Sequence, residues 1–278
     1  LLERLARLHL LSRREANVAA RLGPDAGVDD FLREALRELG ITADLPQGDL
    51  ARVPAKGPLL VVANHPHGIA DGLLLAAELR RVRPDLRVLG NRWLMRIPQL
   101  RELLLDVDLF GGAAVRHSNA APLRAAQRWL AAGNALLLFP AGKVAAMRRG
   151  HQGVHDDTWS AHAARLQRLG GAAALPVHIG GRNSWLFQLA GRVHPRLRTL
   201  LLARETLRMQ GRSVPVRIGN PIPAQQLDRF ADDRERIGYL RLRTDILARR
   251  EDEPRHVVRR SNPIVEPIVP AVATALLQ

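Results

Sequence analysis

The sequence predicts an α/β fold in which a mostly parallel central sheet is flanked by helices. From Pro58 onward, short apolar runs alternate with stretches of helical spacing, which is the order of successive β-α-β units. The 278 residues are enough for one sizeable hydrophobic core. Apolar residues make up 46% of the chain and charged residues 25%, close to the average of globular proteins. We therefore expect one α/β unit with additions at its ends.

The amino-terminal segment has the spacing of amphipathic helices. Residues 1–21 place leucines on one side and arginines mostly on the other, with an interruption of the apolar stripe at Glu15. Such a helix either lies in a membrane interface or packs on the core. A second helix is predicted over 28–39, ended by Gly40. The predicted organisation is an amino-terminal helical segment (1–45), a main domain (46–250) and a linker with a Pro-rich tail (251–278).

The main domain contains six strand candidates separated by helices. The strands are predicted at Leu59–Ala63, Leu86–Gly90, Val107–Phe110, Ala135–Phe139, Ala173–Ile179 and Val214–Ile218. The helices are predicted near 72–82, 92–105, 120–132, 157–169 and 223–250. In such sheets the functional residues gather at the carboxyl ends of the strands.

The charge of the chain indicates an acidic partner. The formal net charge is +15, and nearly all the cations are arginines, which pair bidentately with phosphate. Nucleic acid, an anionic lipid surface, or an acidic carrier such as coenzyme A or acyl carrier protein would each fit, although a GC-rich genome also explains the preference for Arg over Lys. Aromatic residues are 4% of the chain and no nucleic-acid motif is present, so we expect no nucleic-acid partner.

Absent residue types and patterns narrow the possible classes. The chain has no cysteine, which excludes disulfides, thiolate metal sites and cysteine nucleophiles. No apolar run approaches the roughly 20 residues of a spanning helix, so we expect a soluble or peripheral protein. Leu1 is not a methionine and no signal-peptide pattern follows it, which is compatible with an excerpt of a longer protein.

The chemistry is predicted at the end of the apolar strand 59–63. It delivers Asn64, His65, Pro66, His67 and Gly68, and Asp71 follows before a Leu-rich stretch. A histidine is suited to proton transfer near neutral pH, and a carboxylate six residues on can fold back to hold its ring. Asp71 could equally be a helix N-cap, and the two roles can coexist. We predict a catalytic base and its orienting carboxylate.

The stretch from His65 to Gly72 resembles the first motif of the glycerolipid acyltransferase superfamily, the lysophospholipid acyltransferase-like or 1-acylglycerol-phosphate acyltransferase-like domain. The five residues between His65 and Asp71 resemble its bacterial hemolysin-type subfamily, whereas the wider superfamily has four. The segment His65-Pro-His-Gly68 is also similar to the motif of the diacylglycerol and monoacylglycerol acyltransferase branch. The resemblance implies a glycerol-3-phosphate acyltransferase-like α/β fold.

Three further stretches follow in the family's order, within about residues 58–222. Phe139, Pro140, Ala141, Gly142 and Lys143 resemble the Phe-Pro-Glu-Gly block that is thought to contact the acceptor. The stretch Leu175-Pro-Val177 with His178, followed by Arg182-Asn-Ser184, is similar to the later strand block. The stretch from Asp108 to Arg116 stands where the second block, ending in Arg, is expected.

One departure from the family pattern concerns the acceptor. The usual glutamate of the third block is Ala141 here, which removes an acceptor-binding carboxylate. The second block is also poorly kept around Gly111, which weakens the assignment of Arg116 as a phosphate ligand. The turn at Pro140–Gly142 could present backbone N–H groups to an anionic headgroup, with Lys143, Arg148 and Arg149 adding charge, or it is an ordinary turn beside a solvated basic loop.

The resemblance implies transfer of a fatty acyl group from acyl-CoA or acyl-ACP to a lysophospholipid, glycerol-phosphate or lyso-aminolipid acceptor. His65 and Asp71 would be catalytic. Substrate contacts would come from Asn64, Pro66, His67, Gly68, Arg116, Phe139, Pro140, Ala141, Gly142, Lys143 and Arg182. No cofactor or metal is required, because the thioester is a co-substrate. We expect the enzyme to act as a peripheral protein at the cytoplasmic face of the membrane, with an anionic lipid surface as partner.

Two alternatives stay open at this point. A metal-dependent hydrolase could begin its site with His65-x-His67, completed by a histidine such as His117, His151, His155, His162, His178 or His194. The metallo-β-lactamase spacing is absent, since Ile69 and Ala70 occupy the positions of its Asp and His. A non-enzymatic basic module binding lipid or nucleic acid would leave the His-Asp motif unexplained.

Overall fold

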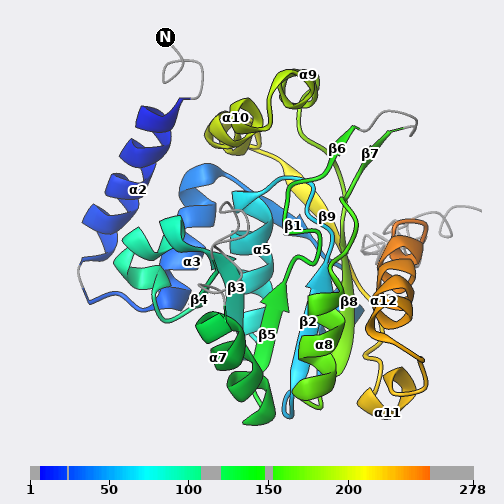
Figure 1. Cartoon of the computed structure of the whole chain (residues 1–278). Helices are drawn as coiled ribbons and strands as arrows, with labels where there is room; N and C mark the ends of the chain where they lie inside the picture. Colours follow the sequence, from blue (N-terminus) through cyan, green and yellow to red (C-terminus); the bar gives the residue numbers. More distant parts are fainter. Residues whose placement is uncertain (1–6, 24, 108–119, 148–152, 251–278) are drawn as a thin grey trace, which may run out of the picture.

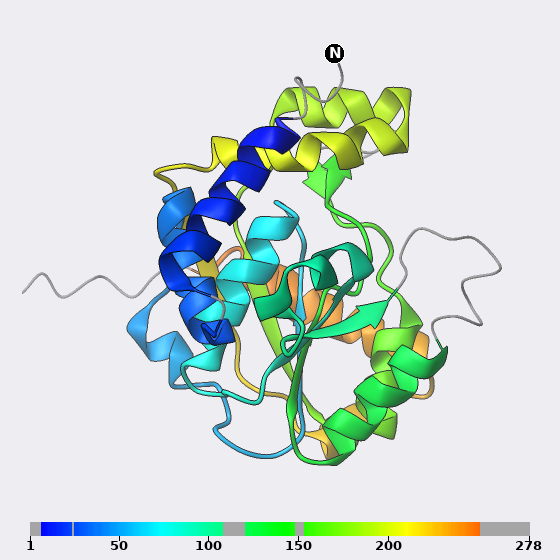
Figure 2. The same cartoon turned by 90° about the vertical axis from the view of Figure 1, so that its left-hand side faces the viewer.

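The central feature of the fold is a mostly parallel sheet in which most strands end toward one common edge (Figures 1 and 2). A computed structural model of the chain describes residues 7–23, 25–107, 120–147 and 153–250. Within them, seven strands form the main sheet, in the order β1 (Thr42–Asp44), β9 (Ser213–Ile218), β8 (Ala173–Ile179), β2 (Leu59–Ala63), β5 (Ala135–Leu138), β3 (Arg87–Asn91) and β4 (Leu104–Val107). Neighbouring strands from β8 to β4 are parallel, β9 is antiparallel to β8, and β1 runs with β9. The predicted mostly parallel α/β fold is confirmed.

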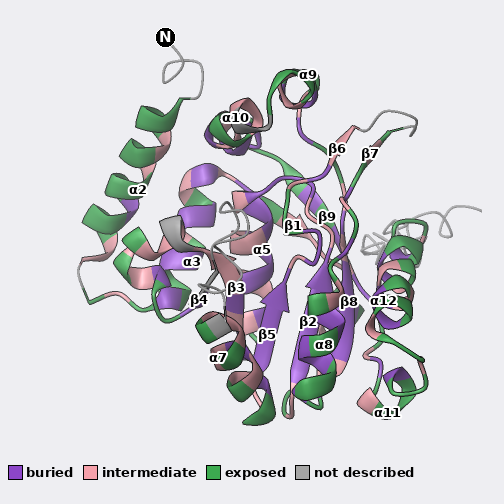
Figure 3. Ribbon diagram, in the orientation of Figure 1, coloured by how far each residue is buried: buried purple, intermediate pink, exposed green. Residues whose placement is uncertain are grey.

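Strand β2 lies at the middle of this sheet and is buried on both faces, as Figure 3 shows. Its side chains alternate between two hydrophobic clusters, with Val61 in the first and Val62 in the second. A strand covered on both faces needs a continuous apolar sequence, which is what Leu59–Ala63 provides. The residues after Ala63 therefore emerge at the centre of the carboxyl edge.

Helices cover both faces of the sheet. The first hydrophobic cluster includes side chains of α2 (Leu8–Leu22), α3 (Val28–Leu39) and α5 (Ile69–Arg80). The second cluster includes α7 (Ala120–Ala131), α8 (Ala161–Leu169), α11 (Ala224–Leu227) and α12 (Asp233–Leu247). The remaining short elements are α4 (Gln47–Leu50), the 3₁₀ turns η1 (Arg92–Arg96) and η2 (Pro98–Leu100), and the antiparallel pair β6 (Ala146–Met147) and β7 (Val154–His155).

Two helices stand apart from these layers. Helices α9 (Trp185–Val193) and α10 (Pro195–Arg208) form a hairpin above the carboxyl edge of the sheet in Figure 1. The sequence prediction missed this hairpin. We call it the α9–α10 hairpin below.

The amino-terminal helix is attached to the main core. Val18 of α2 belongs to the first hydrophobic cluster. Arg21 Nη1 lies 2.8 Å from Glu34 Oε1 and 2.7 Å from Glu38 Oε2, so ion pairs join α2 to α3. Hydrogen bonds from Arg37 and Arg21 lower the pKa of Glu34 to about 2. Residues 1–6 of the predicted helix lie outside the described residues.

Several predicted boundaries are correct and one region is wrong. The strand at Ala173–Ile179 and the helix at 28–39 agree with β8 and α3, and Gly40 ends α3 in the left-handed region at φ 64°. The helix predicted over 92–105 is instead η1, η2 and the start of β4, because Pro98 breaks the helical hydrogen-bond pattern. β4 begins at Leu104, so the predicted strand at 107–110 starts too late, and its residues 108–110 lie outside the described residues.

Candidate active site

The candidate site begins where the asparagine after β2 joins the neighbouring strand. Asn64 Nδ2 donates to the carbonyl of Ile179 at 2.8 Å, and the Ile179 N–H donates to Asn64 Oδ1 at 2.7 Å. These two bonds continue the β2–β8 pairing, whose last backbone partners are Ala63 and Val177. Asn64, predicted as a substrate contact, thus uses its amide to fix the start of the motif to β8.

The two predicted catalytic side chains lie together. His65 Nδ1 is 2.9 Å from Asp71 Oδ2. Although the atoms are close, the direction from Nδ1 does not meet hydrogen-bond geometry, so the two groups are near each other without a hydrogen bond. Catalytic hydrogen bonds are often loose before substrate binds. The structure therefore brings the imidazole and the carboxylate side by side, within reach of each other.

Asp71 also holds the start of helix α5. It is the third residue of that helix, and its Oδ2 accepts the N–H of His67 at 2.8 Å and of Gly68 at 3.0 Å. The alternative prediction, that Asp71 is the N-cap of the helix, is wrong because the helix begins earlier in the chain. The N-cap is Gly68, and the Asp71 carboxylate accepts the Gly68 N–H. With 1% of its surface exposed, Asp71 is shielded from water and its charge acts at short range. The contacts at the helix start are observed, and they leave the predicted orienting role of Asp71 possible in the same carboxylate.

The segment after β5 and the loop before α8 hold His65 from the other side. The His65 ring stacks on Phe139 with centroids 4.1 Å apart. The His65 N–H donates to Asp156 Oδ1 at 3.1 Å, and its carbonyl accepts the Ala145 N–H at 2.8 Å. Burial raises the pKa of Asp156, while its hydrogen bonds from Trp159 and from the His65 N–H partly oppose the rise. Sequence reasoning missed Asp156 and Trp159, because no motif links them to His65.

Two glycines allow a close approach around the motif. Gly68 has φ 86°, and a Cβ there would lie 2.8 Å from Leu202 of α10. Gly181 has φ 95°, and a Cβ there would lie 2.8 Å from His67 Nε2. The same His67 nitrogen is 2.9 Å from the carbonyl of Gly180. The α9–α10 hairpin and the loop after β8 are therefore packed directly on the His-Asp motif.

The predicted acceptor block forms a tight turn after β5. Pro140 and Ala141 are buried, whereas Gly142 and Lys143 are exposed. The Gly142 N–H donates to the Phe139 carbonyl at 2.9 Å, so this N–H closes the turn and does not face outward. Lys143 Nζ lies 3.7 Å from Asp157 Oδ2. Arg116, Arg148 and Arg149, predicted to add positive charge, lie outside the described residues.

A cleft opens beside the motif, between the loop after β8 and the α9–α10 hairpin. Its volume is about 510 Å³, and His67 and the predicted Arg182 are among its lining residues. Asn183, Trp185, Gln188, Glu205, Arg208 and Arg212 also line the cleft. Sequence reasoning named Arg182 but missed the rest, although the arginine density of 182–212 was a usable signal. We call this cleft, beside the His-Asp motif, the motif cleft.

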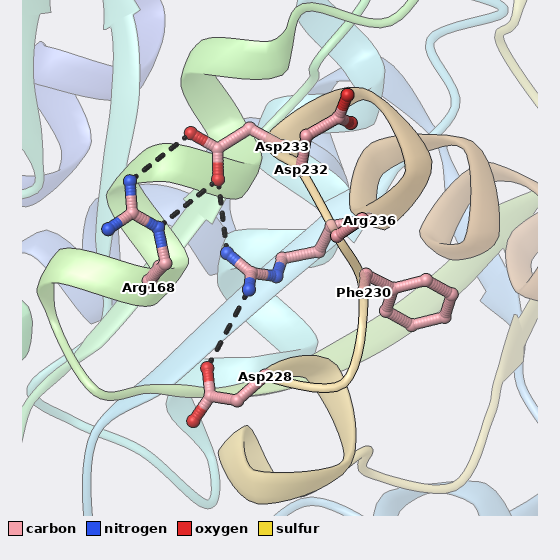
Figure 4. A pocket seen from close by; sticks show the side chains of 7 residues that line it. Arg168, Asp228, Phe230, Asp232, Asp233 and Arg236 are labelled. Carbon is pink, nitrogen blue, oxygen red and sulfur yellow. Dashed lines mark hydrogen bonds and ion pairs between the residues drawn. The ribbon is translucent and has the colours of Figure 1, made fainter.

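A second cavity of about 530 Å³ lies at the opposite, amino edge of the sheet. Figure 4 shows Arg168, Asp228, Asp233 and Arg236 around it, joined by hydrogen bonds and ion pairs. It is lined by the end of α8 and the start of α12, and no residue of the His-Asp motif lines it. Its position gives it no part in chemistry at His65.

The described residues give no group that resembles a metal site. Among them, no three His, Asp or Glu side chains come together as metal ligands. The His65 ring faces Asp71 and Phe139, whereas His67 Nε2 contacts the Gly180 carbonyl. His117 and His151 lie outside the described residues. The two motif histidines thus have separate partners.

No helix in the described part of the chain combines the length and apolar character needed to cross a bilayer.

Comparisons with known proteins give the family of the chain. The profile of the family described as Acyltransferase matches residues 11–253. The lyso-glycine lipid O-acyltransferases of Phocaeicola vulgatus and Bacteroides thetaiotaomicron are each 26% identical, over 228 and 222 residues, covering 80% and 77% of this chain and 78% of each relative. The crystal structure of the 1-acyl-sn-glycerophosphate acyltransferase PlsC from Thermotoga maritima superposes with a TM-score of 0.53 at 18% identity, covering 81% of this chain and 80% of that one. The chain belongs to the Acyltransferase family, which confirms the predicted enzyme class over the hydrolase and the non-enzymatic module.

Proposed function

We propose that this acyltransferase moves a fatty acyl group from a coenzyme A or carrier-protein thioester to a hydroxyl group of a lyso-lipid, with His65 as general base. The observation that carries the proposal is the 2.9 Å contact between His65 Nδ1 and Asp71 Oδ2 at the carboxyl end of β2. Because Nδ1 faces the carboxylate, Nε2 is left for the acceptor hydroxyl. A base so held typically contributes ~10²–10⁴-fold to the rate.

The proposed reaction is a direct acyl transfer in which an ester C–O bond forms and the thioester C–S bond breaks. His65 takes the hydroxyl proton as the acceptor oxygen attacks the thioester carbonyl carbon. The tetrahedral intermediate then breaks its C–S bond, and the imidazolium returns the proton to the leaving thiolate. Asp71, buried beside the ring, stabilises the imidazolium while it exists. The products are an ester and a free thiol, and no step requires a metal.

The acceptor class is inferred from the relatives and from one substitution. The curated relatives are named for a lyso-glycine lipid, and the solved structure for 1-acyl-glycerophosphate. Ala141 stands at the position where the superfamily that this chain resembles has the glutamate of its third block. We therefore propose a lysophospholipid, a glycerol-phosphate derivative or a lyso-aminolipid as acceptor. The hemolysin-type subfamily, the boundaries at residues 45 and 250, and substrate contacts by Arg116 and the Phe139–Lys143 block remain predictions.

The direct experiment is product analysis. Purified protein is incubated with a labelled acyl thioester and mixed lyso-lipids, and the lipids are analysed by mass spectrometry. We expect one class of lyso-lipid to gain the labelled acyl chain, and His65→Ala to abolish the product while leaving the fold intact by circular dichroism. An active His65→Ala protein, or an inactive wild type with acyl-CoA and acyl-ACP alike, contradicts the proposal.

The proposal also places the enzyme on an anionic membrane surface, with the α9–α10 hairpin as its main contact. Trp185 and Val193 of α9 are 70% and 72% exposed, which is unusual for apolar side chains. Residues 182–212 contain seven arginines and one acid, Glu205, which is buried. Exposed apolar side chains in an arginine-rich helical segment are typical of helices that lie in the interface of an anionic bilayer. The hairpin lies above the motif, so docking there would bring lipid to the site (Figure 1).

Helix α2, predicted from the sequence to help docking, offers less apolar surface. Its exposed large apolar side chains among the described residues are Leu8 and Leu10, and Arg14 and Arg21 are paired to α3. Substituting Trp185→Ser with Val193→Ser should release the protein from phosphatidylglycerol vesicles into the supernatant, whereas Leu8→Ser with Leu10→Ser should have a smaller effect. Leu242→Ser with Ile246→Ser is the matched control, since both side chains are 54% exposed on α12. Equal release by this control contradicts the proposed surface.

A further inference from the structure

The motif cleft contains two buried amide groups that lack a partner. Asn183 and Gln188 are each 4% exposed, and Asn183 Nδ2 and Gln188 Nε2 have no hydrogen-bond acceptor among the described residues. The orientation of Gln188 is fixed, because its Oε1 accepts the Met147 N–H at 2.9 Å. Its other end must therefore be a donor. Burying a donor without an acceptor is unfavourable, so these two groups point to a ligand that accepts hydrogen bonds.

Three arginines surround the same cleft from different elements. Arg182 lies in the loop after β8, Arg208 in the last turn of α10, and Arg212 just before β9. All three are exposed, and in the part of the chain that the structure describes no carboxylate pairs with their side chains. Three unpaired guanidinium groups around two amide donors form a site for a group with several anionic oxygens.

The one carboxylate in the cleft is already satisfied by the chain. Glu205 Oε2 accepts the Ser184 N–H at 2.7 Å, and its Oε1 accepts the Ser184 hydroxyl at 2.7 Å. Arg204 Nη1 lies 3.5 Å from the same Oε1. Glu205 is buried, and these contacts fix the start of α9 to α10. The carboxylate therefore supports the cleft and leaves the arginines available.

The cleft reaches the segment of the chain that carries the candidate base. His67, two residues after His65, lines it, and His67 Nε2 is fixed against the Gly180 carbonyl at 2.9 Å. Trp185 lines the cleft and is also the most exposed aromatic residue of the hairpin. A lipid that lay on the hairpin could place a polar group in the cleft and a hydroxyl near His65.

We propose that the motif cleft binds the anionic headgroup of the acyl acceptor, a carboxylate or a phosphate, and so selects acidic lyso-lipids over neutral ones. The inference rests on the proposed lyso-lipid acyltransferase function and assigns the headgroup to Asn183, Gln188 and the three arginines. It supplies an acceptor site in a chain whose third block carries Ala141. The phosphates of coenzyme A have the same chemistry, so the test separates donor from acceptor.

The test measures the KM of each substrate in variants of the cleft. The variants are Arg208→Gln, Arg212→Gln and Gln188→Glu, and the last keeps an oxygen for the Met147 N–H but replaces the donor by a negative charge. Each is assayed with a lyso-lipid bearing a phosphate, one bearing a carboxylate, one zwitterionic and one neutral monoacylglycerol. Arg229→Gln is the matched control, because Arg229 is an exposed arginine near the opposite edge.

The expected result is a KM for an anionic acceptor raised about 10-fold per variant, with kcat changed less than about 3-fold. The KM for monoacylglycerol and for the acyl thioester should stay within about 2-fold, and Arg229→Gln should match the wild type. Which anionic lyso-lipid responds identifies carboxylate or phosphate as the headgroup. Lost affinity for the thioester alone would assign the cleft to the donor and overturn the inference, as would an equal loss for all acceptors or a preference for the zwitterionic one.

The outcome is distinguishable from failure of the function itself. If the wild type acylates no lyso-lipid, the proposed function fails. If it acylates them and the cleft variants keep a normal acceptor KM, only the headgroup site fails. Gln188→Glu carries the buried change, so thermal unfolding is followed in parallel. The two arginine variants alter exposed side chains and decide the matter if Gln188→Glu does not fold.

Discussion

The two cavities at opposite edges of the sheet are nearly equal in size and opposite in how their charges are satisfied. The motif cleft measures about 510 Å³ and the amino-edge cavity about 530 Å³. At the amino edge, Arg236 contacts Asp233 at 3.0 Å and Asp228 at 3.7 Å, and Arg168 contacts Asp233 at 3.3 Å (Figure 4). In the motif cleft, the arginines have no such partners within the described residues.

The difference teaches that volume alone does not identify a site. Charges that pair with one another inside the chain stabilise the fold and leave nothing for a ligand. Charges and amide donors that remain unpaired beside a candidate base are instead ready for a substrate. The comparison gives an ordering of expected effects, in which changes at the carboxyl edge alter catalysis and changes at the amino edge alter stability.

The largest effect is expected at Asp71. Asp71→Asn keeps an oxygen for the His67 and Gly68 N–H groups but removes the charge beside His65. We expect kcat to fall by ~10²–10⁴-fold, because the imidazolium loses its counter-charge, with little change in unfolding free energy. Steady-state kinetics and urea denaturation measure the two quantities. Normal turnover in a folded Asp71→Asn protein would break the assignment of catalysis to this edge.

The opposite behaviour is expected at Arg236. Arg236→Met keeps most of the buried stem but removes the guanidinium that contacts Asp233 and the Leu227 carbonyl. The unfolding free energy should fall by about 2–3 kcal/mol, because acceptors at the amino edge lose their donor. The kcat and KM of the folded enzyme should not change. A selective rise in acceptor KM would show that the amino-edge cavity binds substrate.

An intermediate effect on both quantities is expected at Asn64. Asn64→Ala removes the two hydrogen bonds to Ile179 and leaves a buried N–H and carbonyl of β8 unpaired. A loss of about 2 kcal/mol in stability is expected, together with a drop in kcat of about 10-fold, because the start of the motif is no longer fixed. Denaturation midpoints and initial rates test this. Lost stability with unchanged kcat would separate the sheet contact from the chemistry.

The smallest effect is expected on the pH dependence of stability, through His178 of β8. Burial lowers the pKa of His178, with Asp245 opposing the shift and Arg217 adding to it. The unfolded chain therefore takes up the proton first as the pH falls below about 6.5, so stability decreases toward acid by at most ~1.4 kcal/mol per pH unit. In His178→Gln this part of the slope should vanish. Parallel stability curves between pH 5 and 7 would contradict the lowered pKa of this half-buried histidine.

The sequence predicted the parts of the site that are local in the chain. The strand Leu59–Ala63, His65 and Asp71 lie within a single β-turn-α unit, so spacing alone could place them. Asp156, Asn183 and Gln188 come from distant segments, and they meet the motif because β8 pairs with β2. That pairing order is not encoded in any local period. The predicted helix over 92–105 wrongly includes the apolar run Leu103–Leu105, because short apolar runs fit either period.

The bridge from Asn64 to Ile179 sets a fixed spacing between two parts of the enzyme. It joins the residue before His65 to the last residue of β8, and the loop that leaves β8 carries Arg182 and Asn183. His65 and the groups proposed to bind the headgroup are therefore held at a fixed distance from each other by the β2–β8 pairing. The enzyme would then act as a ruler, accepting lipids whose hydroxyl stands at one set separation from the charged end and rejecting those in which the separation is longer or shorter.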